Sequence, residues 1–425
     1  MLSRLSIIYL SCLLLVFNTA SRAEPGQKTG ANSINLHNAI SKTFEHNPAL
    51  RTFSYALKAQ AGRQLQAGFS SSPELSFSIE DAAGTGGFTG TDNAQATLSI
   101  GWVLEGDIRQ SYIDVSSADK LSINTEANIK RMDVAAETAR LYLICLANQA
   151  RMKNAVKTVE LAKESVVAVK KRVSAGKAPQ AELARTQAEV FRRQLEQEDI
   201  EHELSSTIRL LAAQWGETIP SFSQVEGDIF SLPASIPFAR LKERLRQSPE
   251  FVRLLSEKRL KQAELKLEQS QSDSAWRVNL GVRHFETTND QALVAGISIP
   301  FGERSRNTGR IIEARENLSQ IQAKEDELSV RFEAMLFVLS QELEHSLHRL
   351  NAYRNNIIPQ LEKALKETRR AYRLGRYSYL EWSSVQAELL DARSALVEAG
   401  VDVHLKTIEI ERLTGVQLAQ VVDKS

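Results

Sequence analysis

Two histidines three positions apart are the residues best placed for metal chemistry. His345 and His348 lie close to Glu342 and Glu344 in a pattern typical of a helix. A spacing of three residues can put two ligands on one face of a helix. The chain has only seven histidines and four methionines, and no second cluster accompanies this pair. We therefore interpret the pair as solvated or interhelical and assign no metal site, with coordination by the pair as the alternative.

No arrangement of side chains in the sequence suggests catalysis. Cys145 lies in an apolar helical pattern, which favours a buried, inert thiol over a nucleophile. The polar loop 82–93 contains a G-x-G sequence, but no helix follows it as phosphate binding requires. The chain has no P-loop, and its formal net charge of +1 gives no electrostatic basis for binding nucleic acid. We predict that the protein is not an enzyme and holds no cofactor.

A sixteen-residue stretch that occurs twice is the strongest signal in the chain. The first copy is SAGKAPQAELARTQAE (174–189) and the second is RLGRYSYLEWSSVQAE (373–388), at an offset of 199 residues. Gly176 then matches Gly375, and Glu182 matches Glu381. Each copy is a glycine-centred turn between two long helical patterns. We interpret these turns as the tips of two equivalent helical hairpins.

The segments on either side of the turns follow the same order in both halves. Each half reads as a helix that begins at a proline, two strands, a long helix, the glycine turn and a further helix. At the start of the chain, Arg4, the apolar run 5–17 and Ser21-Arg22-Ala23 are typical of a cleaved signal peptide. The predicted boundaries are a signal peptide at 1–23, a first repeat at 24–216 with strands at about 74–81 and 94–104, a linker at 217–237, a second repeat at 238–415 with strands at about 276–285 and 292–301, and a C-terminal tail at 416–425.

One proline breaks the symmetry of the two halves. Pro359 lies inside the long helical pattern of the second half, and Glu160 is its counterpart in the first. A proline inside a helix costs about 3 kcal/mol unless the helix bends or ends there. We predict a kink or a helix boundary near Ile358, in the second half only.

The four predicted strands alternate apolar and polar residues with period two, as strands of a transmembrane β-barrel do. An ordinary antiparallel sheet covered by helices is the alternative. In lipid every sheet edge must be paired, so four strands from one chain cannot close a barrel. Two chains give eight strands with a filled interior, whereas three give twelve and leave room for a lumen.

The charged helices, roughly 100 Å long for 66 residues, must project into an aqueous compartment. We therefore predict a mainly α-helical chain that supplies four strands to a trimeric twelve-stranded β-barrel and long helices to an α-helical barrel.

This pattern resembles the outer membrane factors of tripartite efflux systems, the TolC-like family, over almost the whole mature chain. The similarity rests on the paired openings HNPAL and QSPEF, the strand ends GWVLEGDIR and ISIPFGERSRNTG, and YRLGRYSYLEWSSVQAELLDAR. Elements at 105–109 and 300–309 are most similar to the heavy-metal, CzcC-like branch. The resemblance implies a homotrimeric channel in the outer membrane lipid of a Gram-negative bacterium, with a periplasmic helical domain. It also implies a periplasmic adaptor and an inner membrane RND-type pump as partners.

The resemblance further implies roles for residues at the two turns. Glu182 and Glu381 match the acidic position six residues after the tip glycine, so three chains would place up to six carboxylates at the pore entrance. Tyr372 matches the tyrosine of the family's constriction, whereas Ser384 and Tyr377 replace an acidic and a basic residue expected there. The adaptor-facing tip positions that the resemblance implies are Gly176, Lys177, Gly375, Arg376 and Tyr377.

Other functions are compatible with parts of the pattern. Proteins of the same fold serve as exit ducts for organic compounds or for type I secretion. A periplasmic adaptor also contains a long helical hairpin, but one hairpin flanked by β domains rather than two with intervening strands. A structural coiled-coil protein would not need strands with an apolar face. The residues favour the efflux duct, with heavy-metal cations as its predicted substrates.

Overall fold

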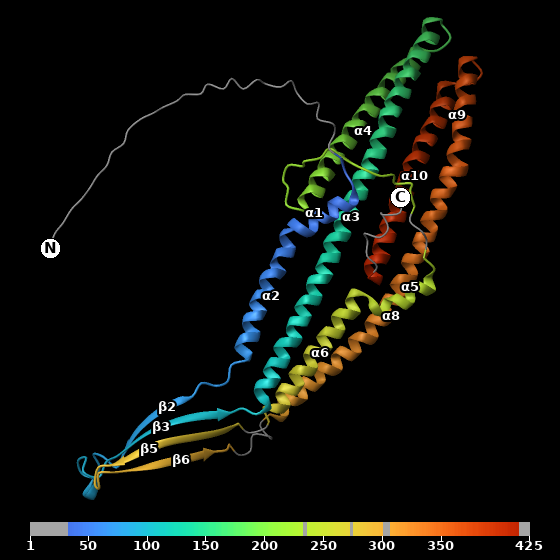
Figure 1. Cartoon of the computed structure of the whole chain (residues 1–425). Helices are drawn as coiled ribbons and strands as arrows, with labels where there is room; N and C mark the ends of the chain where they lie inside the picture. The colour runs from blue at the N-terminus through green and yellow to red at the C-terminus, as the bar shows by residue number, and fades with distance from the viewer. Residues whose placement is uncertain (1–32, 233–235, 273–274, 301–306, 416–425) are drawn as a thin grey trace, which may run out of the picture.

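The fold is an elongated one, with a four-stranded sheet at one end and two helical hairpin tips at the other (Figure 1). The computed structural model describes residues 33–232, 236–272, 275–300 and 307–415. The predicted signal peptide and C-terminal tail lie outside these residues. The helices are α1 (Leu36–His46), α2 (Pro48–Ala67), α3 (Asp107–Ser174), α4 (Gln180–Ala213), α5 (Phe238–Arg244), α6 (Pro249–Ser270), α8 (Thr308–Ala352), α9 (Ile358–Arg373) and α10 (Tyr379–Thr414).

Corresponding helices in the two halves begin in the same way. The Asn47 side chain accepts a hydrogen bond from the Ala49 amide at 2.9 Å, and Pro48 is the first residue of α2. The Ser248 hydroxyl likewise accepts from the Phe251 amide, and α6 begins at Pro249. A capping side chain followed by proline satisfies free amides without losing a helical hydrogen bond.

The other helices of each half pack along a long helical segment, which is one helix in the first half and two in the second. Helix α3 contains 68 residues, which corresponds to about 100 Å, and α2 and α4 both pack against it. In the second half α8 and α9 together replace that helix, and a π-helical segment, Tyr353–Ile357, separates them. Helix α9 begins at Ile358, so the predicted boundary near Pro359 is confirmed, while α3 runs uninterrupted past Glu160.

The four long strands form one antiparallel sheet in the order β2-β3-β5-β6. Their bounds are β2 (Glu74–Glu80), β3 (Gln95–Leu104), β5 (Trp276–Phe285) and β6 (Asp290–Ser298). The register places Phe77, Leu98, Val282 and Leu293 in one row across all four strands. Apolar side chains of successive rows therefore share one face, because side chains along a strand alternate between faces.

The polar face of the sheet is closely packed. Ser76, Ser99, Gly281 and Val294 form the neighbouring row on that face. A Cβ atom at Gly281 would lie 2.6 Å from the Leu98 carbonyl oxygen, so only glycine fits there without a shift of the backbone.

One cluster of the hydrophobic core lies in the middle of the molecule. Two short strands that the sequence did not predict, β1 (Ser33–Ile34) and β4 (Gln224–Val225), pair in parallel there. They join the start of the described chain to the segment predicted as a linker. The pair packs over α3 and α4 in a cluster of buried residues that includes Leu141, Leu211 and Trp215. The chain segment 217–232 is therefore part of the folded core.

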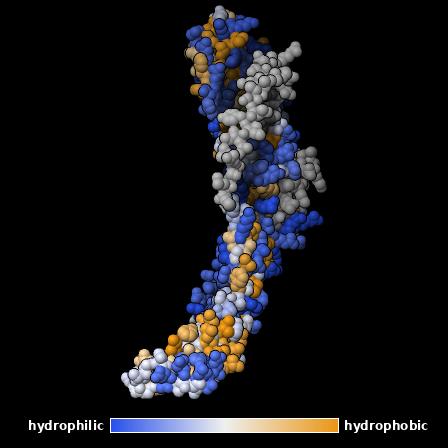
Figure 2. Space-filling model, turned by 60° about the vertical axis from the view of Figure 1, so that its left-hand side comes forward, coloured by the Kyte–Doolittle hydropathy of each residue, from blue (hydrophilic) through white to orange (hydrophobic). Residues whose placement is uncertain are grey.

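The sheet end of the molecule carries an uncovered apolar face. Leu75, Phe77 and Leu293 are 74%, 63% and 81% exposed. Figure 2 shows hydrophobic residues gathered at this end, with mostly hydrophilic helices above it. None of the helices in the described part of the chain is long and apolar enough to cross a membrane.

Candidate functional site at the hairpin tips

The two turns at the tips have the same backbone geometry. The Gly176 amide donates to the Val173 carbonyl at 2.9 Å, and the Lys177 amide to the Arg172 carbonyl at 2.8 Å. Around Gly375 the corresponding hydrogen bonds are 3.0 Å each, to Tyr372 and Ala371. This is the Schellman motif, which places the residue after the helix in the left-handed region. Gly176 and Gly375 have φ values of 68° and 77°, which explains the glycine at both positions.

The helices that follow the turns begin differently. In the second hairpin the Glu381 carboxylate accepts hydrogen bonds from the Ser378 amide at 2.7 Å and hydroxyl at 2.9 Å, while Ser378 caps the Glu381 amide. These hydrogen bonds form a capping box and hold the pKa of Glu381 below its usual range. In the first hairpin Pro179 takes the capping position and has neither an amide hydrogen nor a capping side chain. Glu182 is therefore not engaged in a capping box.

Glu182 instead contacts the second hairpin. Its carboxylate accepts a hydrogen bond from the Tyr372 hydroxyl at 3.4 Å. The structure thus brings together two of the three residues predicted at the pore entrance, although they are 190 positions apart. Burial raises the pKa of Tyr372 to about 12, and the nearby Glu182 carboxylate adds to the shift.

Tyr372 belongs to an aromatic cluster that joins the two hairpins. It is 1% exposed and packs with Val169, Leu183, Tyr379 and Trp382. The ring centroids of Tyr372 and Trp382 are 5.2 Å apart, and Tyr379 packs edge-on against Trp382 at 6.0 Å. Aromatic pairs of this kind add to the stabilisation that burial of the rings provides. The cluster is the main apolar contact near the tips.

Arg172 is the residue at this site that the sequence reasoning missed. Its guanidinium lies 4.6 Å from the centre of the Tyr372 ring, in a cation–π contact. It also donates to the Tyr372 carbonyl and, at 3.2 Å, to the Lys177 carbonyl. Arg172 therefore connects the last turn of α3 with both glycine turns. The sequence shows that Arg172 lies four residues before Gly176, but it does not show that Tyr372 lies beside Arg172 in the fold.

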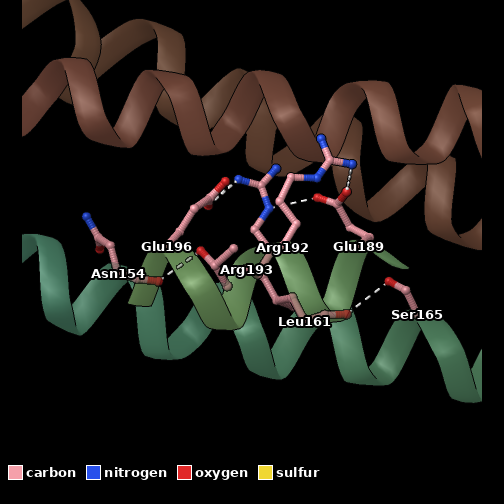
Figure 3. A network of polar contacts seen from close by, with 8 residues as sticks. Asn154, Leu161, Ser165, Glu189, Arg192, Arg193 and Glu196 are labelled. Atoms are coloured by element: carbon pink, nitrogen blue, oxygen red, sulfur yellow. Dashed lines mark hydrogen bonds and ion pairs between the residues drawn. The ribbon is translucent and has the colours of Figure 1, made fainter. Parts of the chain in front are cut away.

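Charged side chains further along α4 are paired within that helix. Arg193 donates to Glu189 and to Glu196, each at 2.7 Å, and Arg192 also pairs with Glu189 (Figure 3). The charges of Glu189 and Glu196 are thus balanced by arginines of the same helix. Between α3 and α9, Arg369 pairs with Glu164 at 2.8 Å, so an ion pair also joins the two hairpins near their tips.

The predicted tip residues lie at the end of the molecule. Gly176, Lys177, Gly375, Arg376 and Tyr377 are all exposed. Helices α3 and α4 carry the first two of these residues on one turn, and α9 and α10 carry the other three on the second turn (Figure 1).

The other candidate residues of the sequence lie away from the tips. His345 and His348 are exposed on α8, and Glu342 near them pairs with Lys406 at 2.6 Å. Among the described residues, no group of three or more His, Cys, Asp or Glu side chains is placed to hold a metal ion. Cys145 is fully buried, and burial raises the pKa of its thiol to about 12. The thiol is therefore buried, as the sequence predicted.

Comparisons with known proteins agree with this architecture. The family model described as "Outer membrane efflux protein" matches residues 39–217. The cobalt-zinc-cadmium resistance protein CzcC of Cupriavidus metallidurans is 24% identical over 91% of each chain. The nickel-cobalt-cadmium resistance protein NccC of Alcaligenes xylosoxydans xylosoxydans is 26% identical over 58% of this chain and 55% of its own. The solved outer-membrane channel OprN matches with a TM-score of 0.73 at 16% identity over 90% of each chain.

These matches support the resemblance to outer membrane factors drawn from the sequence: residues 39–217 match the outer membrane efflux protein family, and the two helical hairpins and four-stranded sheet have the fold of OprN. The chain is similar to CzcC over almost its whole length, and both relatives reported above are named for resistance to heavy metals.

Proposed function

We propose that the protein is the outer membrane exit duct of a tripartite efflux system that expels heavy-metal cations. In this proposal it is a homotrimer that spans the outer membrane of a Gram-negative bacterium. It is a passive channel, and a periplasmic adaptor and an inner membrane RND-type pump deliver the substrate. The observation that carries the proposal is the sheet, which has an uncovered apolar face and strands β2 and β6 at its two edges.

The sheet is suited to closure with other copies of the chain. A ten-residue strand such as β3 is roughly 33 Å long, which matches a hydrocarbon core of about 30 Å. Unpaired edges are not tolerated in lipid, so β6 of one chain pairs with β2 of the next. All neighbours in the sheet are antiparallel, and an even number of strands per chain keeps that alternation across each junction. Three chains then form a twelve-stranded barrel with its polar face inward.

The helices continue the duct on the periplasmic side. The two hairpins of each chain form part of an α-helical barrel, and six hairpin tips surround its entrance. Glu182, Glu381 and Tyr372 lie at that entrance and take part in gating. The turns around Gly176 and Gly375, with Lys177, Arg376 and Tyr377, face the adaptor. Contact between the hairpins through Tyr372, Glu182 and Arg172 supports this assignment, because any opening of the entrance has to move these groups apart.

Heavy-metal cations are the proposed substrates because CzcC and NccC are named as resistance proteins for cobalt, zinc, cadmium and nickel.

Metal tolerance of cells provides the test. We expect that deleting the gene lowers tolerance to Zn²⁺, Co²⁺ and Cd²⁺ several-fold while tolerance to dyes is unchanged, and that the wild-type gene on a plasmid restores it. Growth inhibition on graded concentrations of each metal, of Cu⁺ and of dyes gives the comparison. Sensitivity to organic compounds alone would contradict the proposal of metal export.

A further inference from the structure

The side chain of Arg283 lies across the polar face of the sheet. Its Nε atom donates to the Thr97 hydroxyl oxygen at 2.9 Å, and Nη1 donates to the Gln95 side-chain oxygen at 3.1 Å. Nη2 forms an ion pair with the Glu80 carboxylate at 3.1 Å. The guanidinium therefore reaches from β5 across β3 to β2, and each of its three nitrogens has a partner. Thr97, which it covers, is 6% exposed.

These contacts lie at the end of the sheet that is farthest from the helices (Figure 1). Glu80 is the last residue of β2 and Gln95 is the first residue of β3. Arg283 lies two residues before the end of β5. The helices of the proposed duct are periplasmic, so this end of the sheet faces the exterior of the cell.

The rows of the polar face further from this end carry small side chains. Gly281 follows Arg283 on this face of β5 and leaves no room for a side chain. In the row after that, Gly101 and Gly296 lie on either side of Asn279. A Cβ atom at Gly296 would lie 2.4 Å from the Asn279 side-chain oxygen and would displace that side chain. If the polar face lines a lumen, the lumen is therefore narrower at Arg283 than in the two rows further in.

The charge of Arg283 is balanced by carboxylates at the same end of the sheet. Glu80 pairs with it directly, and Asp290 is the first residue of β6 on the same face. Two carboxylates and one guanidinium leave one negative charge per chain at this end. Charges fixed on the wall of a pore act on passing ions, and a ring of equal charges selects between cations and anions.

We propose that Arg283 is the residue of the barrel wall that sets its ion selectivity and conductance, with Glu80 balancing its charge so that cations pass. This inference rests on the proposed function, because it requires the polar face to line a lumen. Three arginines without partners would form a positive ring, which repels metal cations. The ion pair with Glu80 removes that barrier, while the guanidinium still occupies space at the wall.

A purely structural role of Arg283 makes a different prediction. Its contacts join three strands, so its loss could lower the amount of assembled barrel. A residue that only joins strands would nevertheless leave the selectivity of the barrels that do assemble unchanged. The decisive measurements are therefore made on heat-modifiable trimers purified in detergent and inserted into planar lipid bilayers.

The ratio of K⁺ to Cl⁻ permeability tests the role of the charge. In a KCl gradient around about 0.1 M, where charges act over about 10 Å, we expect Arg283→Gln to raise this ratio about twofold and Glu80→Gln to lower it by a similar factor. The double variant Arg283→Gln/Glu80→Gln and the charge-conserving Arg283→Lys should remain close to the wild type. An unchanged ratio in both single variants would overturn the proposal.

Single-channel conductance tests the role of size. At about 1 M KCl the reach of fixed charges falls to about 3 Å, so the conductance reports mainly the width of the pore. We expect Arg283→Ala to conduct more than the wild type and Arg283→Lys to conduct about as much as the wild type. Wild-type conductance in Arg283→Ala would contradict a narrowing of the barrel by this side chain.

Cysteines beside Arg283 test its surroundings while the arginine stays in place. Ala292 is its neighbour on the polar face of β6, and Leu293 is the next residue, on the apolar face. A membrane-impermeant, positively charged thiol reagent should lower the conductance and the K⁺ preference of Ala292→Cys and leave Leu293→Cys unchanged. Its effect on Val294→Cys, one row further in, should be smaller. Cys145 is fully buried and does not compete. Equal effects on the Ala292 and Leu293 variants would overturn the proposal.

The wild-type protein separates this inference from the proposed function. Wild-type trimers that form no pore in the bilayer would contradict the proposed duct itself. Wild-type pores whose selectivity and conductance are the same in all Arg283 and Glu80 variants would contradict the inference alone, and the proposed duct would stand.

Discussion

At the scale of single residues, Tyr372 connects the two hairpins. Its ring packs against Trp382, carries the Arg172 guanidinium on one face and directs its hydroxyl to Glu182. The ring contributes apolar burial, and the hydroxyl contributes one hydrogen bond of 3.4 Å, which is long. The two contributions can be separated by substitution.

We expect Tyr372→Ala to weaken the packing between the two hairpin tips and Tyr372→Phe to change that packing little. Removing a buried aromatic side chain costs about 3–5 kcal/mol, whereas a single hydrogen bond contributes about 0.5–1.5 kcal/mol. Hydrogen exchange of the full-length protein should show faster exchange in 165–188 and 368–387 for the alanine variant. The baseline conductance of that variant in a lipid bilayer should also rise. A Tyr372→Phe variant as loose as the alanine variant would mean that the hydroxyl, not the ring, holds the hairpins.

The two glutamates show what a sequence repeat can predict about a site. Glu182 and Glu381 align in the repeat, and both lie in the first turn of a helix. Their roles differ because Ser378 can close a capping box and Pro179 cannot. That difference was readable from the residue types. The contact between Glu182 and Tyr372 was not, because it depends on how two hairpins far apart in the sequence pack together.

At the scale of elements, the strands were predictable because one of their faces is apolar. The strict alternation of apolar and polar residues predicted strands where β2, β3, β5 and β6 occur, within a few residues at each end. Pro359 likewise indicated where the long helix of the second half changes. The strands β1 and β4 escaped prediction because two residues are too few to show any period. Their pairing depends on the core around Trp215, which the sequence does not reveal.

The sheet allows a prediction that contrasts its two faces. Phe77 and Ser76 are neighbours in β2, but Phe77 is in the apolar row and Ser76 is in the polar row. An arginine on the lipid-facing side of a barrel costs about 2–4 kcal/mol at the middle of the membrane. We expect Phe77→Arg to reduce the amount of assembled protein in the outer membrane and Ser76→Arg to be tolerated. Heat-modifiable bands of outer membrane fractions measure this, and equal loss in both variants would contradict a lipid-facing apolar side.

At the scale of the whole molecule, the open edges of the sheet predict how many chains assemble. Strands β2 and β6 each have one neighbour within the chain. If β6 pairs with β2 of the next chain, cysteines on the polar faces of the two edge strands meet only between chains. Cys145 is fully buried and does not interfere with such a test.

We expect oxidation of such double-cysteine variants to produce covalent species of one, two and three chains and nothing larger. The variants combine a cysteine at Ser76 or Ser78 in β2 with one at Ala292, Val294, Gly296 or Ser298 in β6. Thr97→Cys/Arg283→Cys is the control, because these residues already pair within one chain and should give monomers only. A series that ends at two chains would indicate an eight-stranded barrel with a filled interior. Species beyond three would indicate a sheet that does not close. Either result would contradict the trimeric duct, because a conducting lumen requires the twelve strands that three chains supply.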